Sequence, residues 1–218
     1  QTEAGIGRCA TGSASALCYD GGMRYEPHRK RVRHFEGQGH LHELTFSCYR
    51  RMPLLTNDVW RGFLANSLGA ACIEEHFNLI AFVFMPEHVH LLVNPLTPEA
   101  KVSRLLARTK QPTSKAVKEM LLESQAPLLQ KLTVRERPGK RCFRFWQEGP
   151  GFDRNLFSPS AIEASIDYIH MNPVNRGLCH RATDWKWSSA RFYVNDVVDP
   201  ILPPIVPPDA RWFDQSGM

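Results

Sequence analysis

A nine-residue apolar run, Phe77 to Met85, constrains the fold more than any other stretch of this chain. The run is too short for a convincing buried helix, and it is rich in the aromatic and branched side chains that strands favour. Pro86 and Glu87 break it, and His88 to Asn94 then resumes an apolar pattern. We therefore predict two neighbouring antiparallel strands, joined by a short turn, in the middle of a sheet.

The segments on either side of this hairpin alternate between strand and helix patterns. Leu41 to Tyr49 alternates apolar and polar residues as a strand does, and Asn57 with its neighbours can cap a helix that runs to about His76. Downstream we predict a helix from Pro98 to about Leu122, divided at Pro112, and then a basic loop from Gln125 to Arg141. A fourth strand at Cys142 to Gln147 should follow, and then a helix that begins at Ser158 or Ser160 and ends at Asn172-Pro173. This order predicts an α+β fold with a ferredoxin-like βαββαβ antiparallel sheet and an additional C-terminal helix.

Composition divides the 218 residues into three predicted segments. Residues 1–38 are rich in Gly, Ser, Ala and charge, and we interpret them as a partly ordered N-terminal extension. Residues 39–195 would form the main domain. Residues 196–218 would be a proline-rich tail, since five prolines fall between Asp199 and Pro208.

The same composition indicates a cytoplasmic location. No apolar run approaches the ~18 residues that cross a bilayer, and the N-terminus lacks the pattern of a secretory signal. The six cysteines, at positions 9, 18, 48, 72, 142 and 179, include no CxxC pair. This spacing argues against a zinc ribbon or a disulfide framework and predicts a reduced protein without a membrane span.

Basic residues are concentrated in two parts of the chain. From Lys101 to Arg154 there are thirteen Lys or Arg against five Asp or Glu, and a second cluster includes Arg31 and Arg33. Such surfaces attract phosphate backbones, but a solvated surface that only favours solubility explains them equally well. The candidates for phosphate contacts are Arg31, Arg33, Lys101, Arg104, Arg108 and Lys110.

His88 and His90 are separated by one residue on a predicted strand. Because side chains on a strand alternate with a period of two, both imidazoles leave the same face of the sheet. Two imidazoles on one face can converge on a divalent ion. The spacing alone does not distinguish such a site from a strand that merely carries two histidines.

Tyr168 and Asn172 lie four residues apart on the final predicted helix and therefore share one face. An amide oxygen such as that of Asn172 is a suitable hard ligand for a divalent ion. The alternative is structural: Asn172 would only end the helix before Pro173, while Tyr168 would fill the edge of the core.

Five motifs occur in an order that resembles a known family. Met85 to Leu92 resembles the His-hydrophobic-His signature of the single-tyrosine (HuH) transposase superfamily. It is followed by Phe145–Gln147, Asp167–Val174, Gly177–Leu178 and Trp185–Ser189. The ordered set resembles the REP-associated tyrosine transposases, which are related to small insertion-sequence transposases, over about residues 31–193.

This resemblance implies a metal-dependent endonuclease and strand-transferase that acts on single-stranded DNA with palindromic hairpins. In the matching motifs, His88, His90 and Asn172 would hold Mg²⁺ or Mn²⁺. Tyr168 would be the nucleophile, on a catalytic C-terminal helix, and would form a 5′-phosphotyrosine intermediate. Glu87 and His170 are candidates for supporting these groups.

Rejoining through such an intermediate needs no nucleotide cofactor, and the chain contains no GxxxxGK[ST] phosphate loop. The resemblance leaves open whether the protein acts as a monomer or a homodimer. Three alternatives remain at this point: a catalytically silent hairpin-binding protein, a replication or conjugation initiator of the same superfamily, and a structural ferredoxin-like domain with coincidental motifs.

Overall fold

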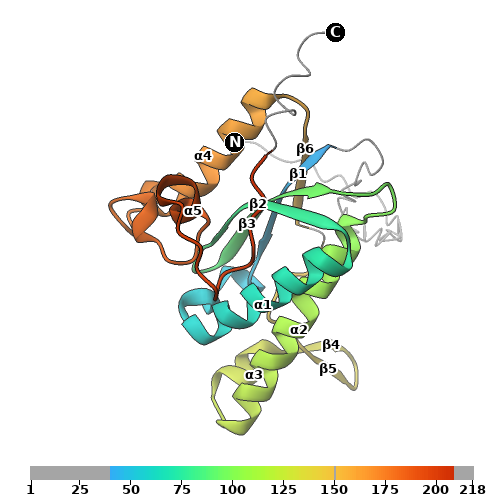
Figure 1. Cartoon of the computed structure of the whole chain (residues 1–218). Coiled ribbons are helices and arrows are strands. Elements are labelled where there is room, and N and C mark those ends of the chain that lie inside the picture. The colour runs from blue at the N-terminus through green and yellow to red at the C-terminus, as the bar shows by residue number, and fades with distance from the viewer. Residues whose placement is uncertain (1–39, 150, 209–218) are drawn as a thin grey trace, which may run out of the picture. The chain divides into compact units, whose positions relative to one another are not determined.

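The computed structural model describes residues 40–149 and 151–208. The predicted N-terminal extension, including Arg31 and Arg33, lies outside the described residues. Four antiparallel strands form the main sheet, in the order β2-β3-β1-β6 (Figure 1). They are β1 (Leu41–Ser47), β2 (Phe77–Phe84), β3 (His88–Pro95) and β6 (Phe152–Leu156). This order is that of a ferredoxin-like sheet, and the predicted α+β fold class is confirmed.

The predicted central hairpin is confirmed as β2 and β3. Its turn is held from both ends: the Met85 N–H donates to the His88 carbonyl at 2.8 Å, and the Pro86 and Glu87 carbonyls accept from Leu55 and Cys48. The loop after β1 thus supplies the partners that a tight turn leaves without bonds. This fixes the point at which β3 begins, and with it the position of His88.

Helices α1 (Asp58–Glu74) and α2 (Val102–Glu123) pack against each other and cover one face of the sheet (Figure 1). The α1 helix begins where predicted, because the Asn57 side chain accepts hydrogen bonds from the Val59 and Trp60 N–H groups. The core on this face is largely apolar. Its members include Leu44 and Phe46 of β1, Leu64 and Leu68 of α1, and Leu105 and Val117 of α2.

Helix α4 (Pro159–Asn175) packs against the opposite face of the sheet, where Ile162, Ile166 and Ile169 contact Ile80 and Val83 of β2. Ser158 caps the helix through its hydroxyl, as predicted. A short 3-10 turn, η3 (Ala182–Asp184), and helix α5 (Ala190–Asn195) follow it. The three isoleucines recur at helical spacing, and this is why the sequence pattern located the helix.

Two predicted helix boundaries were wrong, and both involve proline. Helix α2 is continuous through Pro112, and α4 continues past Asn172-Pro173 to Asn175, where Gly177 at φ +67° follows. A proline removes one backbone donor, but burial of the apolar face on both sides of it stabilises the helix more than this loss costs. None of the helices in the described part of the chain is long and apolar enough to cross a membrane.

The predicted fourth strand, Cys142 to Gln147, was also wrong. Its first residues belong to β5 (Lys140–Phe143), which pairs with β4 (Thr133–Arg137) in a separate two-stranded sheet. The predicted basic loop accordingly contains α3 (Leu128–Leu132) and β4. The fourth strand of the main sheet is β6, which the pattern missed because only Leu156 of its five residues is buried.

Candidate active site

His88 and His90 leave β3 on the face of the sheet that α4 covers. Their Nε2 atoms lie 2.9 Å apart and both side chains are buried. Strand β1 lies alongside, with Thr45 directly opposite His90 in the antiparallel register. The strand therefore brings the two imidazoles to one point, as their spacing predicted.

The other nitrogen of each ring is held by a neighbouring residue. Nδ1 of His90 is hydrogen-bonded to the Thr45 hydroxyl at 2.8 Å, and Nδ1 of His88 lies 3.1 Å from a Glu87 carboxylate oxygen. Arg176 donates to the same oxygen of Glu87. These bonds fix the orientation of both rings, so that both Nε2 atoms face the centre of the site.

Burial favours the neutral form of both histidines. Burial lowers the pKa of His90 to about 4, and the charge of His88 acts in the same direction. Burial also lowers the pKa of His88, against the opposing effect of Glu87. Since an ionised carboxylate can only accept, His88 carries its proton on Nδ1 and leaves the Nε2 lone pair directed into the site.

Helix α4 brings Asn172 and Tyr168 to the same point. Asn172 Nδ2 lies 3.3 Å from Nε2 of His90, and the Tyr168 ring meets the His90 ring edge-on with 5.3 Å between centroids. Asn172 Oδ1 is buried and has no hydrogen-bond partner among the described residues. A buried amide oxygen without a partner is costly, so Asn172 has an oxygen that it could offer to a ligand.

The donors available for a cation are thus two imidazole nitrogens and one amide oxygen. No cluster of three or more His, Cys, Asp or Glu with metal-binding geometry occurs within residues 40–149 and 151–208. The amide oxygen is a hard ligand of the kind that Mg²⁺ and Mn²⁺ take, and three protein donors are one fewer than a structural zinc site has. The arrangement is therefore that of an open site with room for further ligands.

An open cavity of about 470 Å³ lies over these residues. Its wall consists of Glu43, Thr45, Arg51, His88, His90, Phe152, Arg154 and Tyr168. Within it, Glu43 accepts hydrogen bonds from Arg154 at 2.5 Å and from the Ser165 hydroxyl at 3.0 Å. The cavity joins the histidine pair to two arginines and to the half-exposed ring of Tyr168.

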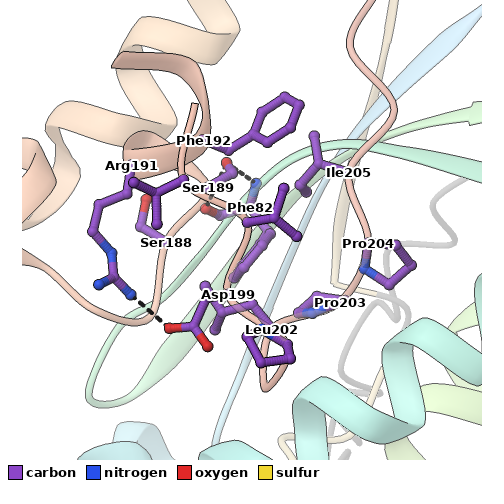
Figure 2. A pocket seen from close by; sticks show the side chains of 13 residues that line it. Phe82, Ser188, Ser189, Arg191, Phe192, Asp199, Leu202, Pro203, Pro204 and Ile205 are labelled. Atoms are coloured by element: carbon purple, nitrogen blue, oxygen red, sulfur yellow. Dashed lines mark hydrogen bonds and ion pairs between the residues drawn. The ribbon is translucent and has the colours of Figure 1, made fainter. Parts of the chain in front are cut away.

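His170 does not face this cavity. Its Nε2 lies 2.8 Å from the Ser189 hydroxyl, which is also hydrogen-bonded to both backbone groups of Phe82 (Figure 2). Ser189 lines a second, largely apolar pocket of about 320 Å³ beside the C-terminal segment. His170 therefore ties α4 to β2, whereas Glu87 directly supports a site histidine, as the sequence suggested.

The predicted phosphate contacts on α2 lie away from the histidine pair. Arg104 and Arg108 each donate to buried Glu75 at 2.6 Å, at the end of α1. Lys110 lies over the Phe46 ring at 4.6 Å, and burial lowers its pKa to about 8. Lys101 precedes α2 and is exposed. Helix α2 covers the face of the sheet opposite the site. Phe46, which lies under Lys110, belongs to that face because it points away from the neighbouring Thr45.

The sequence reasoning missed two residues that hold the site together. Thr45 became visible only through the register of β1 against β3, which no local pattern specifies. Arg176 had a signal: it follows Tyr168 and Asn172 at intervals of four, so helical spacing places all three along one stripe. The helix reaches nearly to Arg176 because it does not end at Pro173.

Comparison with known proteins supports the resemblance inferred from the motifs. Residues 38–133 match the family described as "Transposase IS200 like". No curated protein matches the chain in sequence. Among solved structures, a REP-associated tyrosine transposase bound to a REP hairpin shares 19% identity, with a TM-score of 0.59 over 82% of this chain and 93% of that one. A transposase-like protein from Deinococcus radiodurans R1 shares 20% identity over 65% of this chain and 96% of that one, with a TM-score of 0.38.

Proposed function

We propose that this chain, which is related to the IS200-like transposases through residues 38–133, cleaves and rejoins single-stranded hairpin DNA with Tyr168 as the nucleophile. We also propose that the substrate is a palindromic hairpin and that cleavage requires a divalent metal, Mg²⁺ or Mn²⁺. We further propose that the protein acts in the cytoplasm, without a nucleotide cofactor.

One observation carries the proposal: the Nε2 atoms of His88 and His90 lie 2.9 Å apart. Two lone pairs at this distance repel each other unless a proton or a cation lies between them. Asn172 reaches the same point through its amide nitrogen, its Oδ1 is buried without a partner among the described residues, and the Tyr168 ring contacts the His90 ring. A purely structural ferredoxin-like domain would gain nothing from this combination, because the buried Asn172 oxygen without a partner is destabilising.

His88, His90 and Asn172 fit Mg²⁺ or Mn²⁺ and would hold it through two nitrogens and an amide oxygen. A divalent ion in this place would supply a Lewis acid for the scissile phosphate. Residues of the protein orient these ligands: Thr45 and Glu87 fix the orientation of the two imidazole rings, and Arg176 holds Glu87 in place.

The proposed chemistry is an exchange of phosphodiester bonds. The Tyr168 phenol loses its proton, its oxygen attacks the scissile phosphorus, and the bond from phosphorus to the 3′ oxygen breaks. The released 3′ oxygen takes up a proton and becomes a 3′-hydroxyl. Because the 5′-phosphotyrosine conserves the bond, attack by a 3′-hydroxyl reverses the step and rejoins the strand.

Tyr168 and the two histidines come from one chain in this structure, and we propose that the site is complete in a monomer. The His90 and Tyr168 rings are already in contact. A mixture of Tyr168→Phe and His90→Ala proteins should therefore form no covalent adduct. Recovery of the adduct on mixing would show that two chains share a site and would favour a homodimer.

The direct test of the proposed function is an adduct assay. Labelled single-stranded hairpin DNA is incubated with the protein and Mn²⁺, and a denaturant-resistant complex is sought by gel electrophoresis. We expect an adduct with the wild type, none with EDTA and none with Tyr168→Phe. Tight hairpin binding without any adduct would instead support the second candidate, a catalytically silent hairpin-binding protein.

A further inference from the structure

Strand β6 is the edge strand that pairs with β1, and its residues alternate between the two faces. Phe152, Arg154 and Leu156 pair with Thr45, Glu43 and Leu41 of β1. Two of these three β6 residues, Phe152 and Arg154, line the catalytic cavity. An aromatic ring and a guanidinium therefore stand two residues apart beside the histidine pair, although no predicted site included them.

Phe152 is 52% exposed, although it lies next to the residue that holds His90. The preceding Gly151 has φ +82°, and a Cβ atom there would collide with the Thr45 carbonyl oxygen. Only glycine lets the chain approach β1 so closely at this φ. The backbone thus holds an exposed aromatic ring at the edge of the cavity, where it adds little to the core.

Arg51, which follows β1 in the chain, also lines this cavity. It has φ +53°, directly after Arg50 with φ +52°, and non-glycine residues adopt this region only at an energetic cost. No ion pair joins Arg51 to a carboxylate of residues 40–149 or 151–208. Arg50, by contrast, lies over the Tyr49 ring and does not line the cavity.

Arg154 differs from Arg51 because Glu43 already neutralises it. The Arg154–Glu43 pair is 2.5 Å long, and Ser165 of α4 adds a third member. Arg154 is thereby held in position at the rim. Of the two cavity arginines, Arg51 is the one whose charge remains available for an anion.

We propose that Arg51 and Phe152 form a binding subsite for one unpaired nucleotide beside the scissile phosphate. Phe152 stacks on the base and Arg51 binds the phosphate. Arg154, paired with Glu43, forms part of the cavity wall beside them. Stacking on a side chain requires a free base face, which a nucleotide inside a duplex does not offer. This inference rests on the proposed function, because the cavity is taken to hold the DNA strand.

The first test compares two DNA probes by fluorescence anisotropy without divalent metal, so that no cleavage occurs. One probe is a hairpin with a short unpaired flank, and the other is the same hairpin with a blunt stem. Phe152→Ala should weaken binding of the flanked probe about tenfold, as expected for one lost stacking contact, and leave the blunt probe unchanged. Phe157→Ala is the matched control, since Phe157 is also exposed but contacts the His40 ring in a tilted arrangement outside the cavity.

The nucleotide itself is located by abasic substitution along the flank. At one flank position, removal of the base should weaken binding to the wild type about tenfold. With that probe Phe152→Ala should cause no further loss of affinity, because the same stacking contact is already absent. If Phe152→Ala lost the same affinity for the flanked and the blunt probe, the stacking assignment would be wrong. It would also be wrong if the losses from Phe152→Ala and from base removal added up at every flank position. Melting temperatures of the variants show whether each remains folded.

The phosphate contact has its own readout in the salt dependence of binding. Arg51→Ala should reduce the slope of log affinity against log salt by about 0.7, the value for one phosphate contact on a single strand. Arg50→Ala is the matched control, because Arg50 has the same charge and a similar φ to Arg51. This variant should leave the slope unchanged. Identical slopes for the two variants would overturn the assignment of Arg51.

These results are independent of the adduct assay. If wild type forms no adduct but the flank preference still depends on Phe152, the subsite stands and the nuclease proposal fails. If wild type forms the adduct but Phe152→Ala and Arg51→Ala bind the flanked probe normally, the subsite fails and the nuclease proposal stands.

Discussion

On β1, Leu44 and Phe46 turn toward the face of the sheet that α1 and α2 cover, whereas Glu43 and Thr45 turn toward the face that α4 covers. The first face carries a large core that is mostly apolar. The second combines a smaller apolar cluster with the histidine pair, Asn172 and a cavity. The same four strands therefore support stability on one side and the proposed chemistry on the other.

This difference explains how a polar site is tolerated inside a small domain. Neutral histidines whose Nδ1 atoms have hydrogen-bond partners cost less to bury than charged ones, while an unsatisfied amide oxygen adds a further cost. The apolar face can offset that cost because its burial is nearly complete. Substitutions on the two faces should consequently separate stability from activity, and the following four predictions test this separation.

The largest expected effect is on the α4 face, with Tyr168→Phe. Loss of the hydroxyl should reduce adduct formation at least on the order of 10³-fold, since no other group can take the place of a covalent nucleophile. The ring is half-exposed, so unfolding free energy should change by less than about 0.5 kcal/mol. Quantified adduct formation and thermal unfolding measure the two. Cleavage at the wild-type rate would refute the nucleophile.

Leu91→Ala reverses the pattern on the opposite face. Leu91 is the neighbour of His90 on β3, but it is fully buried in the core under α1 and α2. Its truncation should lower the unfolding free energy by about 2–5 kcal/mol, while the adduct yield per folded molecule stays near wild type. Urea unfolding gives the first value. A selective loss of activity in fully folded Leu91→Ala would contradict the division between the faces.

Metal addition should stabilise the protein through the α4 face only. At a Mn²⁺ concentration of 100 times its Kd, we expect a gain of about 2.7 kcal/mol in unfolding free energy, which EDTA abolishes. His90→Ala should lose this gain because one ligand is missing. Differential scanning calorimetry with and without Mn²⁺ measures the shift. An unchanged shift in His90→Ala would place the ion elsewhere.

The smallest expected effect comes from Thr45→Val, which removes the hydrogen bond to Nδ1 of His90 but keeps the side-chain volume. Loss of such a support should weaken Mn²⁺ binding by about 10–100-fold. Ser47→Ala is the matched control, because Ser47 lies on the same face of β1 opposite His88. Isothermal titration calorimetry compares the two, and equal affinities would show that Thr45 does not orient His90.

Local patterns in the sequence were sufficient for much of the fold. The central hairpin, the Asn57 cap of α1 and the isoleucine stripe of α4 all appeared where the pattern predicted them. Strand β6 was missed because an edge strand with one buried residue carries little apolar signal. Pro112 and Pro173 were misleading, since burial of the helices around them could not be read from nearby residues.

The sequence by itself determined which residues could share a face: His88 with His90 on a strand, and Tyr168 with Asn172 on a helix. Side-chain periodicity is a local property of the backbone, so it needs no knowledge of the rest of the chain. Only the tertiary structure decided that these two faces meet, that Thr45 lies opposite His90, and that Phe152 and Arg51 border the same cavity. Strand register and helix placement depend on packing between segments far apart in sequence, and that packing is a property of the whole folded domain.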